Sequence, residues 1–139
     1  MLAQKEPAKM VDTFDLSGNV NGFVTELFKA GEKTTIYLSC VKAGSFKGYH
    51  LHRVRAARYF CIKGRIKIIL YKNGIREEHV LDENEPTRLC IPSNIATGIL
   101  NIGATDGWLI NYPDPPYDPD LLDEQVEYTE EELEKGIVK

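Results

Sequence analysis

The sequence predicts an all-β domain, a sandwich or barrel of short strands that is followed by one short helix. Nine short runs with strand-like patterning recur between residues 22 and 112, and turn residues separate them. No stretch in that region carries the helical period of about 3.6 residues. Closely spaced strands without helices between them favour a sandwich or barrel over an α/β fold. The strand candidates cover residues 22–28, 34–42, 48–52, 58–63, 65–71, 76–81, 87–91, 96–102 and 107–112.

The segments between these runs contain residues typical of tight turns. Asn73 and Gly74 lie between two alternating runs and give the clearest hairpin signal, because both residues tolerate the left-handed backbone of a two-residue turn. Residues 113–119 contain four prolines, which cannot donate backbone hydrogen bonds within a sheet. The main sheet structure is therefore predicted to end after Tyr112.

The C-terminal part carries the signals of a short helix. Thr129 and Glu132 have the spacing of a capping box, and acidic residues fill the first turn, where the helix dipole favours them. A chain of 139 residues suits a single domain. We predict a flexible N-terminal arm over residues 1–12, a barrel over 13–119, and an acidic C-terminal segment with the short helix over 120–139.

The composition indicates an ordinary globular protein, with 42% hydrophobic and 27% charged residues. The longest apolar runs are far too short to span a bilayer, and residues 1–7 show no secretory signal. The sequence therefore predicts a cytoplasmic location and no membrane partner. Cys40, Cys61 and Cys90 lack Cys-x-x-Cys spacing and lie in strand-like runs, so we expect buried thiols rather than disulfides.

Charge is segregated along the chain. The stretch from Lys33 to Arg76 holds eleven of the seventeen Lys and Arg residues and no acid, whereas Asp114 to Glu134 holds ten acids and no base. One interpretation is an ordinary solvated surface with an acidic tail. The other is a positive region that attracts a phosphate-bearing ligand. The net charge of −4 argues against nucleic acid as the partner.

Two segments carry paired motifs with regular spacing. Gly44, His50, His52, Ala57 and Gly64 occur at the spacing of the first cupin motif, in which a glutamate normally takes the fourth place. The chain thus resembles the cupins, which implies a jelly-roll β-barrel. Two residues that are two apart on a strand point to the same face, so the two imidazoles are expected to point into the barrel. The alternative is a purely structural, packed pair of histidines.

The second motif is kept in part. Pro92 and Asn101 match the second cupin motif, but Thr97 stands where metal-dependent cupins carry a histidine, as Ala57 stands in place of their glutamate. Two imidazoles alone make an incomplete site, because a catalytic transition-metal centre usually needs three protein ligands. We therefore expect no metal ion and no other cofactor.

A closer resemblance covers most of residues 19–119. The segments 47–52, 91–101 and 109–112, followed by 116–119, are similar to the dTDP-4-dehydrorhamnose 3,5-epimerase family in a short form, and residues 21–28 fall where that family carries an N-terminal motif. The dTDP-4-keto-6-deoxyglucose 3,4-ketoisomerases are related to it. The resemblance implies a metal-free epimerase or isomerase that acts on a nucleotide-linked 4-keto-6-deoxy sugar. The reaction would remove a proton next to the ketone.

The resemblance also assigns roles to residues. His50 is the candidate base and Tyr112 the candidate acid, because imidazole and phenol have suitable pKa values. Lys47 replaces a family arginine; it keeps the positive charge but lacks the paired guanidinium donors that bind a phosphate in a bidentate way. His52 is expected beside the sugar. The remaining substrate-binding candidates are Arg55 and Arg58, for the diphosphate or the enolate oxygen, and Glu26 from the N-terminal motif. The alternative for Tyr112, Arg55 and Arg58 is an ordinary exposed side chain.

Some family residues are replaced, which keeps other functions open. Asn19 and Asn21 stand in place of an aspartate and a substrate-clamping arginine, and the lysine expected near the enolate falls at Ala57. The aspartate that orients the histidine in longer epimerases lies in an extension that this sequence lacks. The alternatives are a non-catalytic cupin that binds a sugar nucleotide and a metal-dependent sugar isomerase or oxygenase. We also expect a homodimer that pairs through an edge strand over residues 21–28.

Overall fold

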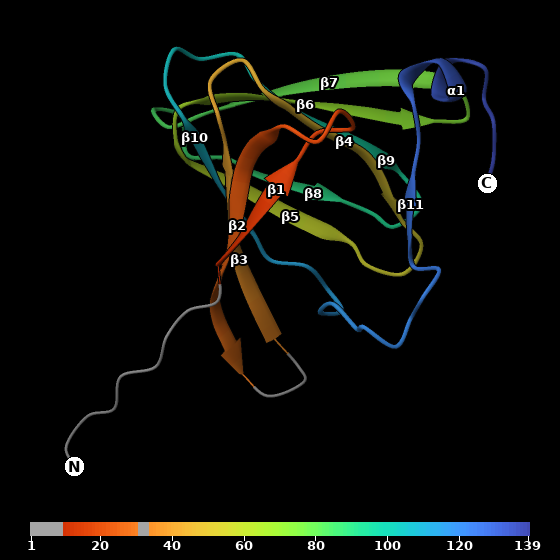
Figure 1. Cartoon of the computed structure of the whole chain (residues 1–139), viewed down its shortest axis with the longest axis horizontal. Coiled ribbons are helices and arrows are strands. Elements are labelled where there is room, and N and C mark those ends of the chain that lie inside the picture. Colours follow the sequence, from red (N-terminus) through yellow and green to blue (C-terminus); the bar gives the residue numbers. More distant parts are fainter. Residues whose placement is uncertain (1–9, 31–33) are drawn as a thin grey trace.

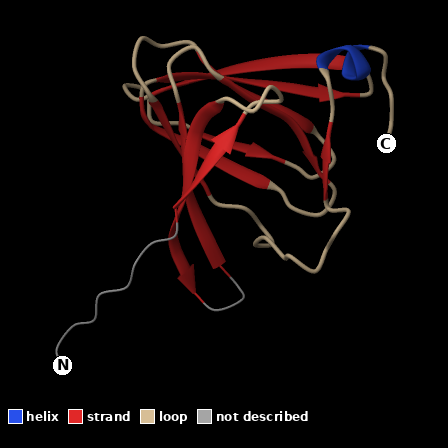
Figure 2. Cartoon of the chain, in the orientation of Figure 1, coloured by secondary structure: helices blue, strands red, loops and turns tan. Residues whose placement is uncertain are grey.

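The computed structural model describes residues 10–30 and 34–139, and in these residues the chain forms eleven strands and one short helix (Figure 1). Strands dominate the structure, as Figure 2 shows, so the prediction of an all-β fold is confirmed. The strands are β1 (Met10–Phe14), β2 (Val20–Ala30), β3 (Thr34–Val41), β4 (Phe46–His52), β5 (Ala57–Lys63), β6 (Arg65–Lys72), β7 (Ile75–Asp82), β8 (Arg88–Ile91), β9 (Ala96–Asn101), β10 (Gly107–Asn111) and β11 (Gln125–Glu127).

The strands form two antiparallel sheets. One sheet has the order β1-β2-β3-β10-β5-β8, and the other has the order β11-β4-β9-β6-β7. In each sheet, strands that are far apart in the sequence lie side by side: β10 lies between β3 and β5, and β4 lies between β11 and β9. This crossing of the chain between two sheets is the arrangement of a jelly roll.

The main core fills part of the space between the sheets. Side chains alternate along each strand, so Ile66, Ile68 and Leu70 of β6 point inward and meet Leu109 of β10. Ile66, Ile68 and Leu109 have no exposed surface. Tyr59 and Ile99 complete one end of this cluster and also line the cleft described below. The barrel is thus packed over part of its interior and open over the rest.

A second apolar cluster lies under the C-terminal helix α1 (Glu130–Glu134). Leu133 of the helix packs with Tyr49, Tyr71 and other members of the five-stranded sheet. Thr129 is the N-cap, and both hydrogen bonds of the capping box are present. The Thr129 side chain accepts from the Glu132 backbone N–H, and the Glu132 carboxylate accepts from the Thr129 backbone N–H. The predicted helix and its start are confirmed.

The ends of the barrel differ from the predicted boundaries. Residues 10–12, which we expected in the flexible arm, belong to β1, and residues 1–9 of that arm lie outside the described residues. β1 pairs with β2, so β2 is flanked on both sides and is not the edge strand that we expected over residues 21–28. The predicted homodimer stays a prediction, and the strand at this edge of the sheet is β1, not β2.

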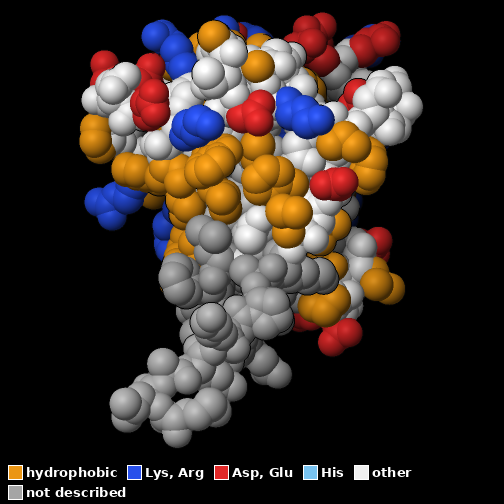
Figure 3. Space-filling model, turned by 60° about the vertical axis from the view of Figure 1, so that its left-hand side comes forward, with side chains coloured by type: hydrophobic (Ala, Val, Ile, Leu, Met, Phe, Trp, Pro, Cys, Tyr) orange, Lys and Arg blue, Asp and Glu red, His pale blue; other side chains and the backbone are white. Residues whose placement is uncertain are grey.

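The three cysteines differ in exposure. Cys40 and Cys61 are buried, but Cys90 is exposed, because alternation along β8 turns it to the outer face; all three are free thiols. Hydrophobic side chains gather on the face of the molecule shown in Figure 3. In the part of the chain that the structure describes, no helix has the length and apolar character needed to cross a membrane.

Candidate functional site

A cleft of about 640 Å³ is lined by residues from both sheets. His50, His52 and Lys47 of β4 form part of it, and the six-stranded sheet supplies much of the remainder. A larger depression of about 830 Å³ lies next to it, beside the turn between β1 and β2 and the start of α1, and shares Phe14, Lys47 and His50 with the cleft. Both imidazoles line the smaller cleft but only His50 lines the larger depression, so the smaller cleft is the candidate site.

A β-bulge in β4 brings three cationic or titratable side chains to one face. Lys47 pairs with Ile99 and His50 pairs with Thr97, so three steps along β4 correspond to two steps along β9. The extra residue shifts the alternation by one position. Lys47 therefore lines the same cleft as His50 and His52, although strict alternation would turn it to the opposite face.

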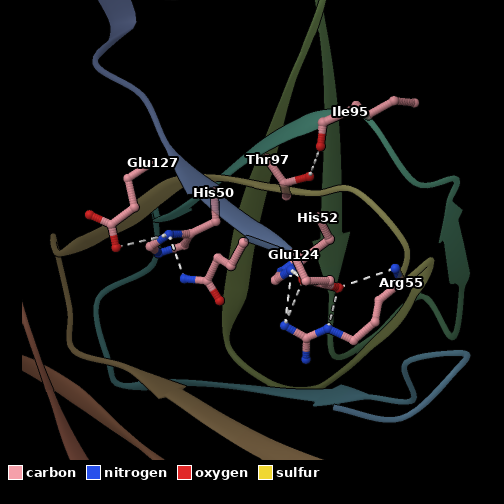
Figure 4. A network of polar contacts seen from close by, with 8 residues as sticks. His50, His52, Arg55, Ile95, Thr97, Glu124 and Glu127 are labelled. Carbon is pink, nitrogen blue, oxygen red and sulfur yellow. Dashed lines mark hydrogen bonds and ion pairs between the residues drawn. The ribbon is translucent and has the colours of Figure 1, made fainter. Parts of the chain in front are cut away.

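His52 belongs to a buried polar cluster with Arg55 and Glu124 (Figure 4). Arg55 Nε donates to Glu124 Oε1 at 2.7 Å, and the Arg55 backbone N–H donates to the same oxygen at 3.2 Å. The ring atom Nδ1 of His52 lies 3.0 Å from Glu124 Oε2 and 2.9 Å from an Arg55 guanidinium nitrogen. The side chains of Arg55 and Glu124 are only 12% and 7% exposed.

Burial and the charges in this cluster shift two pKa values. Burial by itself raises the pKa of Glu124, but hydrogen bonds and charge from Arg55 and His52 outweigh burial, so the net pKa is lowered. Burial and the nearby Arg55 lower the pKa of His52, although Glu124 acts against them. Glu124 is therefore ionised and His52 is neutral at pH 7.

His50 has partners on β11. Antiparallel pairing places Glu127 opposite His50 and Gln125 opposite His52. Nδ1 of His50 lies 3.3 Å from Gln125 Nε2 and 3.6 Å from Glu127 Oε1. Figure 4 shows the His50 ring facing Glu127. Burial lowers the pKa of His50, and the Glu127 carboxylate offsets part of that shift. A neutral imidazole with an unprotonated nitrogen is suited to accept a proton.

Lys47 is a buried cation whose partners are neutral. Its side-chain nitrogen Nζ donates to the Phe23 carbonyl at 3.3 Å and to Ser39 Oγ at 3.1 Å, and the residue is 8% exposed. Burial lowers its pKa to about 8. Among the described residues, no carboxylate forms an ion pair with Lys47, so its charge is available to an anion that enters the cleft.

Comparison with known proteins shows where this chain belongs. Residues 18–125 match the family model described as "Polysaccharide biosynthesis C-terminal domain". The chain belongs to this family. The spore coat polysaccharide biosynthesis protein SpsL of Bacillus subtilis (strain 168) is 27% identical over 89 residues, which cover 59% of this chain and 59% of SpsL. This domain therefore spans little more than half the length of that relative.

Solved structures with the same fold support the cupin prediction. The capsular polysaccharide assembling protein CapF from Staphylococcus aureus has a TM-score of 0.74 at 21% identity and covers 88% of this chain, which corresponds to 32% of CapF. An oxalate oxidase has a TM-score of 0.59 at 15% identity and covers 68% of this chain and 51% of its own. At these identities the likeness shows the fold alone, and the predicted cupin jelly roll is confirmed. The narrower resemblance to the dTDP-4-dehydrorhamnose 3,5-epimerases stays a prediction.

The structure brings together five of the seven predicted site residues of this polysaccharide biosynthesis domain. Those that line the cleft are Glu26, Lys47, His50, His52 and Arg55.

Arg58 and Tyr112 are not among the described residues that line the cleft. Arg58 forms an exposed ion pair with Asp114 at 3.1 Å and stacks on the ring of Tyr112, 5.3 Å from its centroid. Alternation explains both positions: Asn111 and Tyr59 point inward, so their neighbours Tyr112 and Arg58 point away. The phenols on the cleft belong to Tyr37, Tyr59 and Tyr117.

The residues at the cupin metal positions do not fit a metal ion. Thr97 donates to the Ile95 carbonyl at 3.4 Å (Figure 4). Ala57 packs against the core. The described ranges, residues 10–30 and 34–139, contain no cluster of three or more potential metal ligands. The Arg55 guanidinium next to His52 would also repel a cation.

Several site residues escaped the sequence analysis. Glu124, Gln125 and Glu127 come from the segment that we interpreted as an acidic tail, and they supply the orienting partners of both histidines that we expected to be missing. The charge segregation was the one available signal. Asn21, in the place of the clamping arginine, is buried, donates to the Phe46 carbonyl at 3.1 Å and accepts from Thr13 at 2.7 Å. Asn21 of β2 therefore links β1 and β4 through hydrogen bonds.

Proposed function

We propose that this domain is an epimerase or isomerase that acts on a nucleotide-linked 4-keto-6-deoxy sugar during polysaccharide biosynthesis. The observation that carries the proposal is a pair of half-buried, neutral histidines on one strand, each next to a carboxylate, in a cleft that also contains the buried cation of Lys47. Family membership supports a role in polysaccharide biosynthesis. The names of SpsL and CapF point the same way.

The proposed reaction uses side chains of the cleft in three roles. His50 takes the proton from the carbon next to the ketone, and the electron pair moves to the carbonyl oxygen. Lys47 stabilises the negative oxygen that results, because its charge is buried and no carboxylate within residues 10–30 and 34–139 is paired with it. Tyr59 replaces Tyr112 as the candidate proton donor, since it lines the cleft and burial raises its pKa to about 12, which keeps the phenol protonated.

Proton exchange tests this proposal directly. The wild-type protein is incubated in deuterium oxide with dTDP-4-keto-6-deoxyglucose, and incorporation next to the ketone is followed by NMR. We expect His50→Gln to lose at least about 100-fold in exchange rate, the usual contribution of a general base. His79→Gln is the matched control, because His79 is also paired with a glutamate but lies on β7, outside the cleft. Wild-type exchange in His50→Gln would remove His50 from the mechanism.

A non-catalytic role in binding sugar nucleotides is the second candidate. It is favoured by two observations: Tyr112 lies off the cleft, and Asn21 is tied to the backbone of β4 instead of reaching a substrate. This function predicts saturable binding of the nucleotide sugar with no deuterium incorporation. Any turnover in the exchange experiment excludes it.

A further inference from the structure

Four polar side chains form a row across the six-stranded sheet. Glu26 of β2 pairs with Tyr37 of β3, Tyr37 pairs with Asn111 of β10, and Asn111 pairs with Tyr59 of β5. Directly paired residues on antiparallel strands have their side chains on the same face. All four side chains line the cleft, so the row forms one wall, and the histidines of β4 come from the other sheet.

One atom of this row is buried without a partner. Among the described residues, Asn111 Oδ1 is buried and has no hydrogen-bond partner. If the amide were turned over, its N–H₂ group would occupy the same buried place and lack an acceptor instead. Buried polar atoms in folded proteins are nearly always satisfied, so this exception means that the fold's own hydrogen bonds do not satisfy the Asn111 amide, whose other polar atom is available to a ligand in the cleft.

The neighbours of Asn111 are also suited to hydrogen bonding. Burial raises the pKa of Tyr59 to about 12, and burial together with Glu26 raises that of Tyr37, so both phenols stay protonated and can donate as well as accept. Neighbouring strands lie about 4.8 Å apart. Successive groups of the row are thus spaced to reach different substituents of a sugar ring.

The charges of the row favour a neutral sugar over a phosphate. Glu26 would repel a phosphate at one end of the row, and the other three members carry no charge. The cations of the cleft, Lys47 and Arg55, lie outside the row. A diphosphate is therefore expected near those cations, and the sugar ring is expected against the row.

We propose that this row is the sugar-recognition site of the cleft, and that Asn111 determines specificity through a hydrogen bond between its side-chain amide and a polar substituent of the sugar. The proposal shares with the proposed function only a nucleotide sugar as the ligand and requires no proton abstraction. It concerns sugar binding, whereas the exchange experiment concerns chemistry.

Binding and stability measured together test this role. Isothermal titration compares dTDP-glucose with dTDP, and thermal unfolding is followed on the same samples. Asn111→Leu has a similar size but no polar atoms. We expect it to bind dTDP-glucose about tenfold more weakly, the loss of one good hydrogen bond, while its affinity for dTDP is unchanged. Its Tm should stay equal to that of the wild type or rise, because the unsatisfied buried atom is gone.

Two further variants make the result specific. Tyr37→Phe is expected to weaken dTDP-glucose in the same way, whereas Tyr112→Phe, next to Asn111 on the chain but off the cleft, should change neither ligand. A Tm lowered by several degrees with unchanged preference for dTDP-glucose over dTDP would make Asn111 structural and overturn the proposal. So would a wild-type protein that binds dTDP-glucose no better than dTDP, even if it catalyses proton exchange. If the wild-type protein prefers dTDP-glucose over dTDP but catalyses no proton exchange, the proposed reaction is refuted and the sugar-recognition site is not.

Discussion

Replacing Glu124 by glutamine tests whether the cluster around His52 holds the C-terminal segment to the barrel. Glu124 accepts from the side chain and the backbone of Arg55 and contacts His52. Glutamine keeps the acceptor at Oε1 but puts an N–H₂ group where Oε2 faces the guanidinium and the imidazole. The variant thus leaves the Arg55 cation buried, 12% exposed, without an opposite charge.

The expected loss of stability is large for a substitution that keeps side-chain size. Removing one member of a buried ion pair costs about 3–5 kcal/mol. Because glutamine retains one acceptor for Arg55 Nε, we expect the lower end, about 3 kcal/mol. Asp114→Asn is the matched control, since the Arg58–Asp114 pair is 43% and 60% exposed and such pairs contribute at most about 1 kcal/mol. The double variant Arg55→Met with Glu124→Gln should recover part of the loss, since no unpaired charge is left.

Urea unfolding, followed by the fluorescence of the single tryptophan Trp108, measures these differences. The lowered pKa of Glu124 also sets a pH dependence. A carboxylate with a lowered folded pKa contributes stability above its unfolded pKa and loses it as pH falls through the folded value. The difference between wild type and Glu124→Gln should therefore shrink below about pH 4. A loss no greater than that of Asp114→Asn at pH 7 would refute the buried pair.

Three further predictions concern the histidines, the second cupin motif and the helix. Burial lowers the folded pKa of His50 and His52, so the free energy of unfolding should fall as pH drops from about 6.5. In the double variant His50→Gln with His52→Gln, the free energy of unfolding should fall less steeply with pH. The same slope in wild type and double variant would contradict this. Asn101→Ala should lose about 2–3 kcal/mol in urea unfolding, because buried Asn101 donates to two carbonyls and accepts a third bond; a loss under about 1 kcal/mol would disagree. Thr129→Ala should lose about 1 kcal/mol by removing the N-cap while Thr129→Ser keeps it, and equal losses would exclude capping.

Much of the fold could be predicted because local sequence signals and the final structure agree. Alternating residues identified the strands of both sheets, since one side of each strand faces the core. Asn73 and Gly74 adopt positive φ values of 53° and 76°, as the predicted two-residue hairpin requires. β1 and β11 were missed for the opposite reason: they are short, mostly exposed strands, so their sequences carry little alternation.

The site was predicted less completely, because inward and outward positions differ by a single residue. The His-x-His pair needs only alternation, and both rings line the cleft. Lys47 lines the cleft because of the bulge in β4, which the residue pattern did not reveal. On β10 the resemblance indicated Tyr112, but the register places Asn111 inward. A family resemblance aligns strands reliably, whereas the facing of each side chain depends on registers and bulges.

The C-terminal segment changes how the segregated charges are interpreted. The acids from Asp114 onward fold back onto the basic region: Glu124 pairs with Arg55, and Asp114 pairs with Arg58. Part of the positive potential that suggested a phosphate ligand is therefore neutralised within the chain. In the part of the chain that the structure describes, Lys47 has neutral hydrogen-bond partners, so an anion in the cleft is expected to gain most from that cation. Lys47→Gln should then weaken dTDP binding more than Arg55→Gln does, and titration at two salt concentrations would show the reverse order if Arg55 held the phosphates.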